Sequence, residues 1–185
     1  VNKPPSITGV YITPLEANTA STLTCSAQGW SDPDGDSPAY EWNWFVNGAK
    51  VNHEAAVLGP QWFAKGDLVV CRPVPLDDYN AGVGISSAPL TILNSPPSAT
   101  AEIQPSDPTS NTDISCTADW LDPDVTDIPA YTFSWVVDGV ILEEQTETTL
   151  ESTFFGRDNT VVCIAVPFDG EASGPPSNSS PVVIS

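Results

Sequence analysis

The sequence predicts an all-β protein that consists of two consecutive antiparallel β-sandwiches. Three observations point to this fold class: the second half of the chain repeats the first, short apolar runs alternate with polar residues, and proline or glycine interrupts each run. The chain has 185 residues, of which 19 are Pro and 12 are Gly, and chain breakers at this density disfavour long helices. Because a sandwich domain takes about 100 residues, the length accommodates two.

The repeat consists of landmarks that recur in the same order at an offset of 90 to 92 residues. The matching pairs are Cys25 and Cys116, Trp30 and Trp120, Tyr40 and Tyr131, Trp44 and Trp135, Cys71 and Cys163, and Ile92 and Ile184. Self-similarity of this kind predicts one module per copy, over residues 1–93 and 94–185. The segment Asn94-Ser95-Pro96-Pro97 would join them, and its paired prolines favour an extended, semi-rigid connection.

Alternating apolar residues predict half-buried strands around each cysteine and tryptophan. Leu23, Cys25 and Ala27 fall on one face of a strand, and the second copy repeats this pattern. The pairs Asn47-Gly48 and Asp138-Gly139 directly follow the tryptophan strands. They predict tight hairpin turns, since these residues tolerate positive φ.

The cysteines indicate disulfides rather than a metal site. Cys25 and Cys71 are 46 residues apart, and Cys116 and Cys163 are 47 apart. The chain has no CxxC pair and a single histidine, so a zinc site is disfavoured. Two disulfides of equal span fit an oxidising compartment, and we therefore expect an extracellular or cell-surface location.

A cysteine, a tryptophan 19 residues later and a second cysteine resemble the immunoglobulin pattern. The resemblance implies that the disulfides Cys25–Cys71 and Cys116–Cys163 join two sheets, with Trp44 and Trp135 packed on them. Each module would then be an immunoglobulin-like sandwich with one intradomain disulfide. The tyrosine expected two residues before the second cysteine is replaced by valine in both copies.

The loop sequences are similar to bacterial immunoglobulin-like and PKD-type tandem repeats of exported surface proteins. The similarity rests on Asp32-Pro33-Asp34-Gly35-Asp36, Tyr40-Glu41-Trp42, Asn47-Gly48 and Gly66-Asp67. The second copy departs from it, with Val125 and Arg157 in place of the two glycines of the aspartate and Gly-Asp motifs. The resemblance implies an extracellular module for adhesion, spacing or assembly and identifies no ligand.

The composition limits the kinds of molecule that the chain is expected to bind. A net charge of −19, from 24 acidic and 5 basic residues, disfavours nucleic acid and anionic membrane surfaces, which need basic surface. No stretch approaches the ~20 apolar residues of a membrane helix, so we expect no membrane insertion. The expected partners are further copies of the chain or neighbouring immunoglobulin-like repeats, and glycans or surface proteins. The lone His53 lies in no catalytic motif, and we expect no enzyme activity.

Clustered aspartates suggest a calcium site in each copy, because Ca²⁺ takes six to eight oxygen ligands. The candidate ligands are Asp32, Asp34 and Asp36 in the first copy and Asp122, Asp124 and Asp127 in the second. Acids of a later hairpin loop, Asp77 and Asp169, could add oxygens. The alternative is a polar turn in which the aspartates bind nearby backbone N–H groups.

Two further residues are candidate surface sites. Trp62, in a Trp-Phe pair that aligns with Phe154-Phe155, could stack on a sugar or a neighbouring module, or it could pack against the core. Asn178 opens the glycosylation sequon Asn178-Ser179-Ser180 in a loop expected to lie before the last strand.

We therefore expect a structural segment of a surface rod, fibre or filament that assembles end to end or by strand addition. Because residues 1–6 resemble residues 93–98, the repeat pattern would continue in a longer array. The alternatives are an adhesin or a carbohydrate- or protein-binding module of a large secreted protein, and an accessory domain of an enzyme.

Overall fold

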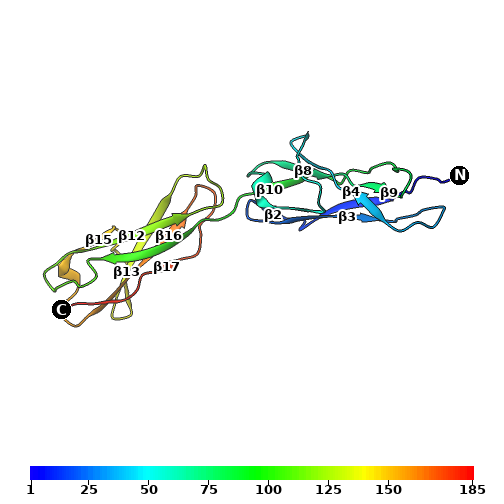
Figure 1. Cartoon of the computed structure of the whole chain (residues 1–185). Helices are drawn as coiled ribbons and strands as arrows, with labels where there is room; N and C mark the ends of the chain where they lie inside the picture. Colours follow the sequence, from blue (N-terminus) through cyan, green and yellow to red (C-terminus); the bar gives the residue numbers. More distant parts are fainter. The chain divides into compact units, whose positions relative to one another are not determined.

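The computed structural model describes residues 1–185. It divides into two compact units, module 1 (Val1–Asn94) and module 2 (Ser95–Ser185), so the boundary lies one residue later than the sequence placed it. Figure 1 shows that each module consists of strands joined by loops, and the residues of each sheet come from a single module. The fold is all-β, as the sequence predicts, with two immunoglobulin-like sandwiches in tandem.

Module 1 packs two sheets against each other. One sheet has the order β1-β3-β7, the other has the order β2-β10-β8-β5-β6, and β4 pairs with β9. The strands are β1 (Gly9–Thr13), β2 (Ala17–Asn18), β3 (Leu23–Gln28), β4 (Ala39–Glu41), β5 (Trp44–Val46), β6 (Ala49–Lys50), β7 (Val57–Leu58), β8 (Leu68–Cys71), β9 (Val74–Leu76) and β10 (Leu90–Leu93). All pairings are antiparallel except that of β2 with β10.

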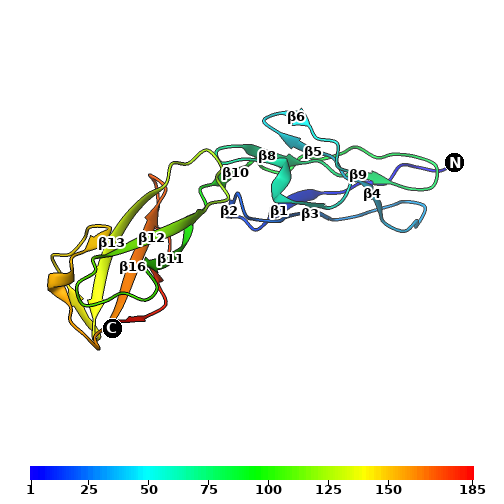
Figure 2. The same ribbon diagram turned by 60° about the vertical axis from the view of Figure 1, so that its left-hand side comes forward.

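Module 2 repeats this arrangement with longer strands. Its sheets have the orders β11-β12-β15 and β14-β13-β16-β17, and β18 also pairs with β16. The strands are β11 (Ser98–Gln104), β12 (Ile114–Leu121), β13 (Ala130–Val137), β14 (Val140–Leu142), β15 (Thr149–Leu150), β16 (Thr160–Phe168), β17 (Ser177–Asn178) and β18 (Val182–Val183). Figure 2 shows β13 and β16, which pair over eight residues, running side by side along this module.

The predicted hairpin turns are confirmed. Asn47 and Gly48 have φ angles of 50° and 81°, and Asp138 and Gly139 have 50° and 82°, which are the positive values that a two-residue turn of this kind requires. The Asn47 side chain also accepts a hydrogen bond from the Leu68 N–H, and Asp138 accepts one from the Thr160 N–H. Each turn is thus tied to the strand that carries the second cysteine.

A disulfide and a tryptophan form the centre of each core. Cys25–Cys71 and Cys116–Cys163 join opposite sheets with Cα–Cα distances of 6.1 Å in both modules. Trp44 and Trp135 are fully buried. Their indole N–H groups donate to the carbonyl oxygens of Ala55 at 2.8 Å and Glu147 at 3.0 Å. The polar atom of each large side chain is therefore satisfied, as burial requires.

The first aromatic of each pair before the second cysteine, Trp62 or Phe154, lies in a short helical turn and not in a strand. These turns are η1 (Pro60–Trp62) and η2 (Ser152–Phe154). Phe63 and Phe155 then enter the core with exposures of 9% and 8%. Both turns have three residues, and no helix of the chain is long and apolar enough to cross a membrane.

We expect reduction of the disulfides to lower the melting temperature sharply. Closing a loop of about 47 residues stabilises a domain by roughly 4 kcal/mol in the chain-entropy estimate, which corresponds to roughly 15–30 °C for a domain of this size. Calorimetry of the oxidised and reduced chain measures the shift. The double variant Cys116→Ala/Cys163→Ala should lower only the transition of module 2, and an unchanged melt would contradict the structural role of this bond.

Candidate functional site

Acidic loops gather at one end of each module, where the chain enters it. In module 1 this end comprises the loop between β3 and β4, the hairpin loop after β9, and the leading segment of residues 2–6. The corresponding parts of module 2 are the loop between β12 and β13, the loop after β16, and the leading segment of residues 95–98. We call each of these ends an acidic pole.

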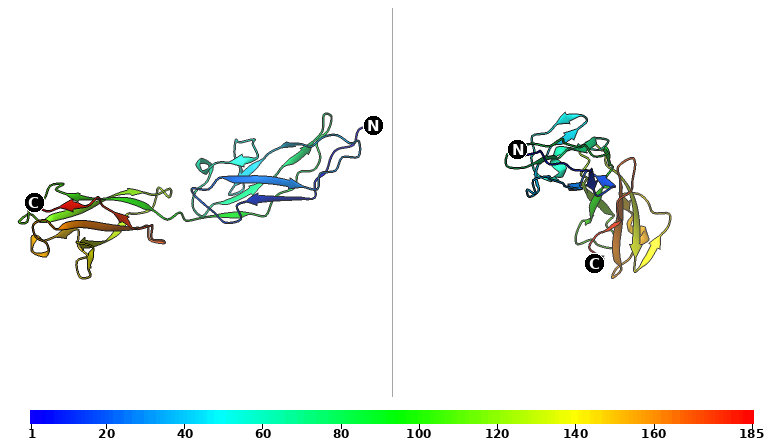
Figure 3. Two further views of the ribbon diagram at one scale, coloured as in Figure 1. Left: turned by 90° about the horizontal axis from the view of Figure 1, so that it is seen from below. Right: turned by 90° about the vertical axis from the view of Figure 1, so that its right-hand side faces the viewer.

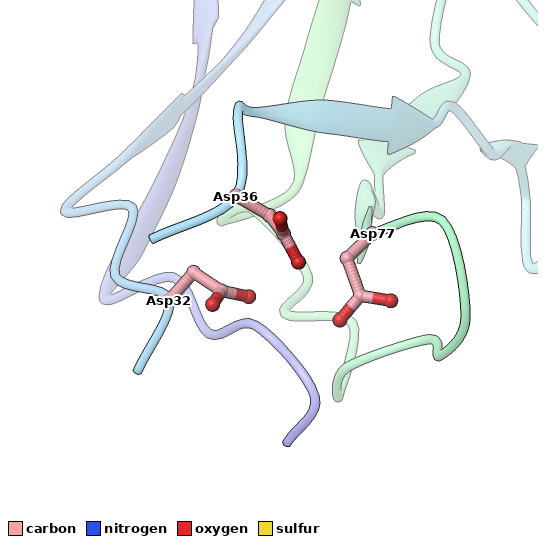
Figure 4. Close-up of side chains that lie close together, drawn as sticks. All are labelled: Asp32, Asp36 and Asp77. Atoms are coloured by element: carbon pink, nitrogen blue, oxygen red, sulfur yellow. The ribbon is translucent and has the colours of Figure 1, made fainter. Parts of the chain in front are cut away.

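Three carboxylates meet at the acidic pole of module 1. One carboxylate oxygen each from Asp32, Asp36 and Asp77 lies within 4.8 Å of the others. Figure 4 shows the three side chains converging, with Asp32 and Asp36 from one loop and Asp77 from the other. Two of the ligands that the sequence suggested, Asp32 and Asp36, thus lie in one cluster, and their binding of a metal stays a prediction.

Local hydrogen bonds orient these carboxylates. Asp32 Oδ1 accepts the N–H groups of Asp34 at 2.7 Å and Gly35 at 3.1 Å. Its other oxygen, Oδ2, is buried and accepts no hydrogen bond. Asp77 Oδ1 accepts the N–H groups of Tyr79 and Asn80, at 2.7 Å and 2.5 Å. Asp32 thus forms the polar turn that the sequence offered as the alternative to a calcium site. This turn uses only one of the two carboxylate oxygens of Asp32.

Module 2 carries the equivalent trio, Asp122, Asp127 and Asp169, again within 4.8 Å of one another. Asp122 Oδ1 accepts the N–H of Asp124 at 2.8 Å, and Asp122 Oδ2 is buried without a hydrogen bond. Asp169 is only 7% exposed and accepts two backbone N–H groups of its own loop. The two poles therefore use the same geometry on three equivalent positions.

Asp34 and Asp124 do not belong to the trios, which departs from the ligand sets that the sequence suggested. Asp34 Oδ2 accepts the Lys3 N–H at 2.7 Å, and Asp124 Oδ2 accepts the Ser95 N–H at 2.7 Å. The turn that starts at the first aspartate directs the middle one toward the leading segment. The third carboxylate of each trio comes instead from the later hairpin loop.

The leading segments are held by close packing as well. Pro5 and Pro97 are buried. A Cβ on Gly82 would lie 1.9 Å from the Pro5 carbonyl oxygen, and one on Gly174 would lie 1.9 Å from the Pro97 carbonyl oxygen. Only glycine allows this approach at its present distance. In module 1 the Asn2 amide also donates to Asp77 Oδ2 at 2.9 Å.

Loss of hydration and neighbouring charges raise the pKa values of two trio members. Loss of hydration and the nearby charges of Asp32 and Asp77 raise the pKa of Asp36. Loss of hydration raises the pKa of Asp122; the hydrogen bond from the Asp124 N–H opposes this shift, and the charges of Asp124, Asp127 and Asp169 add to it. For Asp77 loss of hydration is also the largest cause, but hydrogen bonds from Asn2, Tyr79 and Asn80 together lower its pKa.

The trios suit a hard divalent cation by their donor chemistry. Three carboxylates supply up to six oxygens, which is the ligand type that Ca²⁺ prefers. Asp32 Oδ2 and Asp122 Oδ2, which are buried and lack hydrogen-bond donors, are the atoms that a cation would satisfy. The residues present therefore fit a calcium ion.

The other predicted surface sites lie away from the poles. Trp62 is half-buried and packs against the core of module 1, and its ring centroid lies 5.7 Å from that of His53. Its role in binding stays a prediction. Asn178 is exposed and lies in strand β17, opposite Ile164, rather than in a loop. Figure 3 shows the C-terminal end of the chain in red, where β18 is the one strand that follows β17.

A shallow groove of about 350 Å³ separates β11 from β17 and β18 in module 2. Its lining includes Ile103, Val182, Asn178 and the single acid Glu102. No member of the carboxylate trio lines it. The groove and the acidic pole are therefore distinct features of this module.

Comparisons with known proteins found solved structures of low similarity and no sequence match. No protein-family model matches the sequence, and no curated protein sequence matches it. The chain is similar to the four N-terminal Ig domains of Dscam1 isoform 6.9, with 15% identity and a TM-score of 0.38, over 97% of this chain and 46% of that one. It is also similar to the FN1-FN3 domains of chicken CNTN1, with 13% identity and a TM-score of 0.37, over 98% of this chain and 65% of that one.

A three-domain segment of titin is similar with 12% identity and a TM-score of 0.34, over 99% of this chain and 67% of that one. The chain thus spans about half to two thirds of the length of these structures. At such low identities and TM-scores, the immunoglobulin-like assignment rests on the strand pairing and the disulfides described above. Membership of the PKD-type family stays a hypothesis.

We expect Asp36→Asn to raise the melting temperature of the calcium-free chain by a few degrees at pH 7. The pKa of Asp36 is raised in the folded state, so its protonation favours folding, and the free energy of unfolding contributed by this group increases as the pH falls through that pKa. The gain from the variant should therefore shrink toward pH 3. Thermal melts with EGTA measure it, with Glu16→Gln as a control that removes an isolated exposed charge; equal effects of both variants at every pH would contradict local repulsion.

Proposed function

We propose that this chain is a non-enzymatic structural segment of an extracellular or cell-surface protein, in which immunoglobulin-like modules are joined in series by short, stiff connections. The disulfides favour an oxidising compartment. The tandem repeat supplies the serial arrangement. The strongly acidic composition suits a soluble exposed surface.

The anchoring of the connection on both sides carries this proposal. Leu93 still belongs to β10, and the Asn94 side chain accepts a hydrogen bond from Lys65 of module 1 at 3.0 Å. Ser95 is bound by Asp124 of module 2, and Pro97 is buried in that module. The flexible length between the modules is therefore close to zero residues, and proline stiffens what remains.

We further propose that Ca²⁺ binds the carboxylate trio at each acidic pole and stabilises it. The ion would neutralise the repulsion among Asp32, Asp36 and Asp77, and among Asp122, Asp127 and Asp169. Since Asp122 and Asp124 share one loop, and Asp124 holds Ser95 of the leading segment of module 2, ordering that loop would also fasten this segment. Calcium would thereby stiffen the connection without lying in it.

The adhesin alternative has a less specific basis. The groove between β11 and β17 offers space for a small ligand, and part of Trp62 remains exposed. A smaller groove lies at the equivalent place of module 1, but its lining differs and includes Tyr11 and Leu15, and Trp62 aligns with a phenylalanine. The acidic pole, in contrast, recurs with the same residue types. The structural role therefore accounts for more of what the two copies share.

We expect calcium titration by isothermal calorimetry to show two sites per chain. Asp77→Asn should abolish the site of module 1, because it removes one of three carboxylates, and Asp34→Asn should retain it, because that residue lies outside the trio. A ligand concentration of 100 times the Kd would add about 2.7 kcal/mol to the stability of the bound module. Absence of binding by the unaltered chain at millimolar calcium would refute the metal proposal while leaving the disulfide-based fold untouched.

The stiff connection can be tested with Gly174→Ala. A Cβ at this position must displace Pro97, and we expect the variant to cost about 1–3 kcal/mol in module 2 and to release the leading segment. Backbone ¹⁵N relaxation should give one common correlation time for both modules of the unaltered chain and two shorter ones for the variant. Gly156→Ala is the matched control, since its Cβ would meet no atom closer than 3.8 Å. Independent tumbling in the unaltered chain would contradict the proposal.

A further inference from the structure

One sheet of module 2 presents an apolar outer face to solvent. Along β16 the odd-numbered residues from Val161 to Pro167 are buried in the core, while Val162, Ile164 and Val166 point outward and are half-buried. Val136 lies beside Val162, and Ile141 lies beside Val136 on β14. Ile141 and Val183 of this face are 52% and 61% exposed.

This face carries no charged residue. Its apolar members are Val136, Ile141, Val162, Ile164, Val166 and Val183, and its polar members are Thr132, Ser134, Thr160 and Asn178. We call it the module 2 sheet face. A solvated sheet face normally alternates polar residues with the buried ones. In a chain with 24 acidic residues, an uncharged patch of this extent calls for a partner surface.

The equivalent face of module 1 is charged. Lys50 occupies the place of Ile141, Arg72 the place of Ile164, and Glu41 the place of Thr132. Lys50 and Arg72 are exposed, and Lys50 lies 4.0 Å from Glu41. Half-buried Phe45, Val70 and Val74 lie between these charges. We call this set the module 1 sheet face, and the comparison shows that this fold tolerates charge at both isoleucine positions.

The charges around the two faces are complementary. Four exposed acids, Asp138, Glu143, Glu144 and Asp158, and one exposed base, Arg157, lie at the ends of the strands that form the module 2 sheet face, so its rim is acidic on balance. The module 1 sheet face holds two of the five basic residues of the whole chain. Two copies of the module 2 sheet face would bring their acidic rims together, whereas the module 1 sheet face of another copy offers apolar side chains with basic neighbours.

We propose that the module 2 sheet face of one chain docks on the module 1 sheet face of a second copy of the same chain. Apolar side chains would fill the centre of this contact, and Lys50 and Arg72 would face the acidic rim. Because the contact joins two different surfaces, it is heterologous. The first copy keeps its module 1 sheet face free and the second keeps its module 2 sheet face free, so the contact can propagate from copy to copy. The inference goes beyond the proposed function, since a stiff serial spacer requires no lateral contact.

Sedimentation velocity of the full chain tests the contact from low micromolar to several hundred micromolar protein. The ionic strength is set near 0.15 M, where the Debye length of about 8 Å screens long-range repulsion. The chain is produced in a host that adds no N-linked glycan, because a glycan on Asn178 would cover the module 2 sheet face. The unaltered chain should form concentration-dependent species larger than dimers.

Two variants each remove one side of the contact. Ile141→Lys/Ile164→Arg places the basic residues of module 1 on the module 2 sheet face, and Lys50→Glu/Arg72→Glu reverses the charge of the module 1 sheet face. Each variant alone should associate at least on the order of 30-fold more weakly than the unaltered chain. In the first variant the new charges among the apolar side chains are left unpaired and desolvated, and in the second the new acids face the acidic rim. An equimolar mixture should form dimers and nothing larger, since each variant retains the face that the other lacks.

Other outcomes are equally informative. Thr149→Asp adds a charge on the opposite sheet of module 2, at an exposed position, and should leave association unchanged. If Lys50→Glu/Arg72→Glu associates as well as the unaltered chain, the contact is between two module 2 faces and the proposal is wrong. If the unaltered chain stays monomeric throughout, the proposal is also wrong, while calcium binding and the shared correlation time of the modules would be unaffected.

Discussion

Each module depends on the contact of one disulfide with one buried tryptophan between its two sheets. The cystine fixes the separation of the sheets, and the indole ring fills the space beside it with its N–H bonded to a backbone carbonyl. A sandwich of about 92 residues has a small core and correspondingly marginal stability, and a covalent link across that core compensates for it. Because the disulfide and the tryptophan hold the core together, the loops at the acidic poles can carry residues that have other roles than folding.

The acidic poles show how one loop performs two tasks. The first aspartate of each loop forms a turn with one oxygen and leaves the other buried and without a donor. The middle aspartate holds the backbone of the leading segment, and the last one joins the trio. Anchoring of the incoming chain and concentration of negative charge are thus coupled through a few residues. This coupling is the physical basis for relating cation binding to the stiffness of the connection.

The two copies have diverged most clearly on the outer face of one sheet. Core positions keep their cysteine, tryptophan and small apolar residues, because their volumes are constrained on all sides. The outer positions experience no such constraint, and there the basic and acidic residues of module 1 are replaced by isoleucine and threonine in module 2. Both modules have the same fold, so this difference between equivalent outer positions changes the chemistry of the surface and not the folding of the module.

The sequence by itself determined the fold class, the two modules, the cysteine partners through the immunoglobulin resemblance, and the hairpin turns. These features follow from local periodicity, from residues with restricted backbone preferences and from a repeat that shows its own equivalences. It also suggested that Asp32 and Asp36 belong to one site in module 1, and that Asp122 and Asp127 belong to one site in module 2. Only the tertiary structure decided that Asp77 and Asp169 complete the trios while Asp34 and Asp124 turn to the leading segments, because a loop's side-chain directions depend on its hydrogen bonds. It likewise decided that Trp62 lies in a helical turn against the core, that Asn178 lies on a strand, and that residues distant in sequence form one uncharged face, since strand pairing and not chain order sets which side chains share a surface.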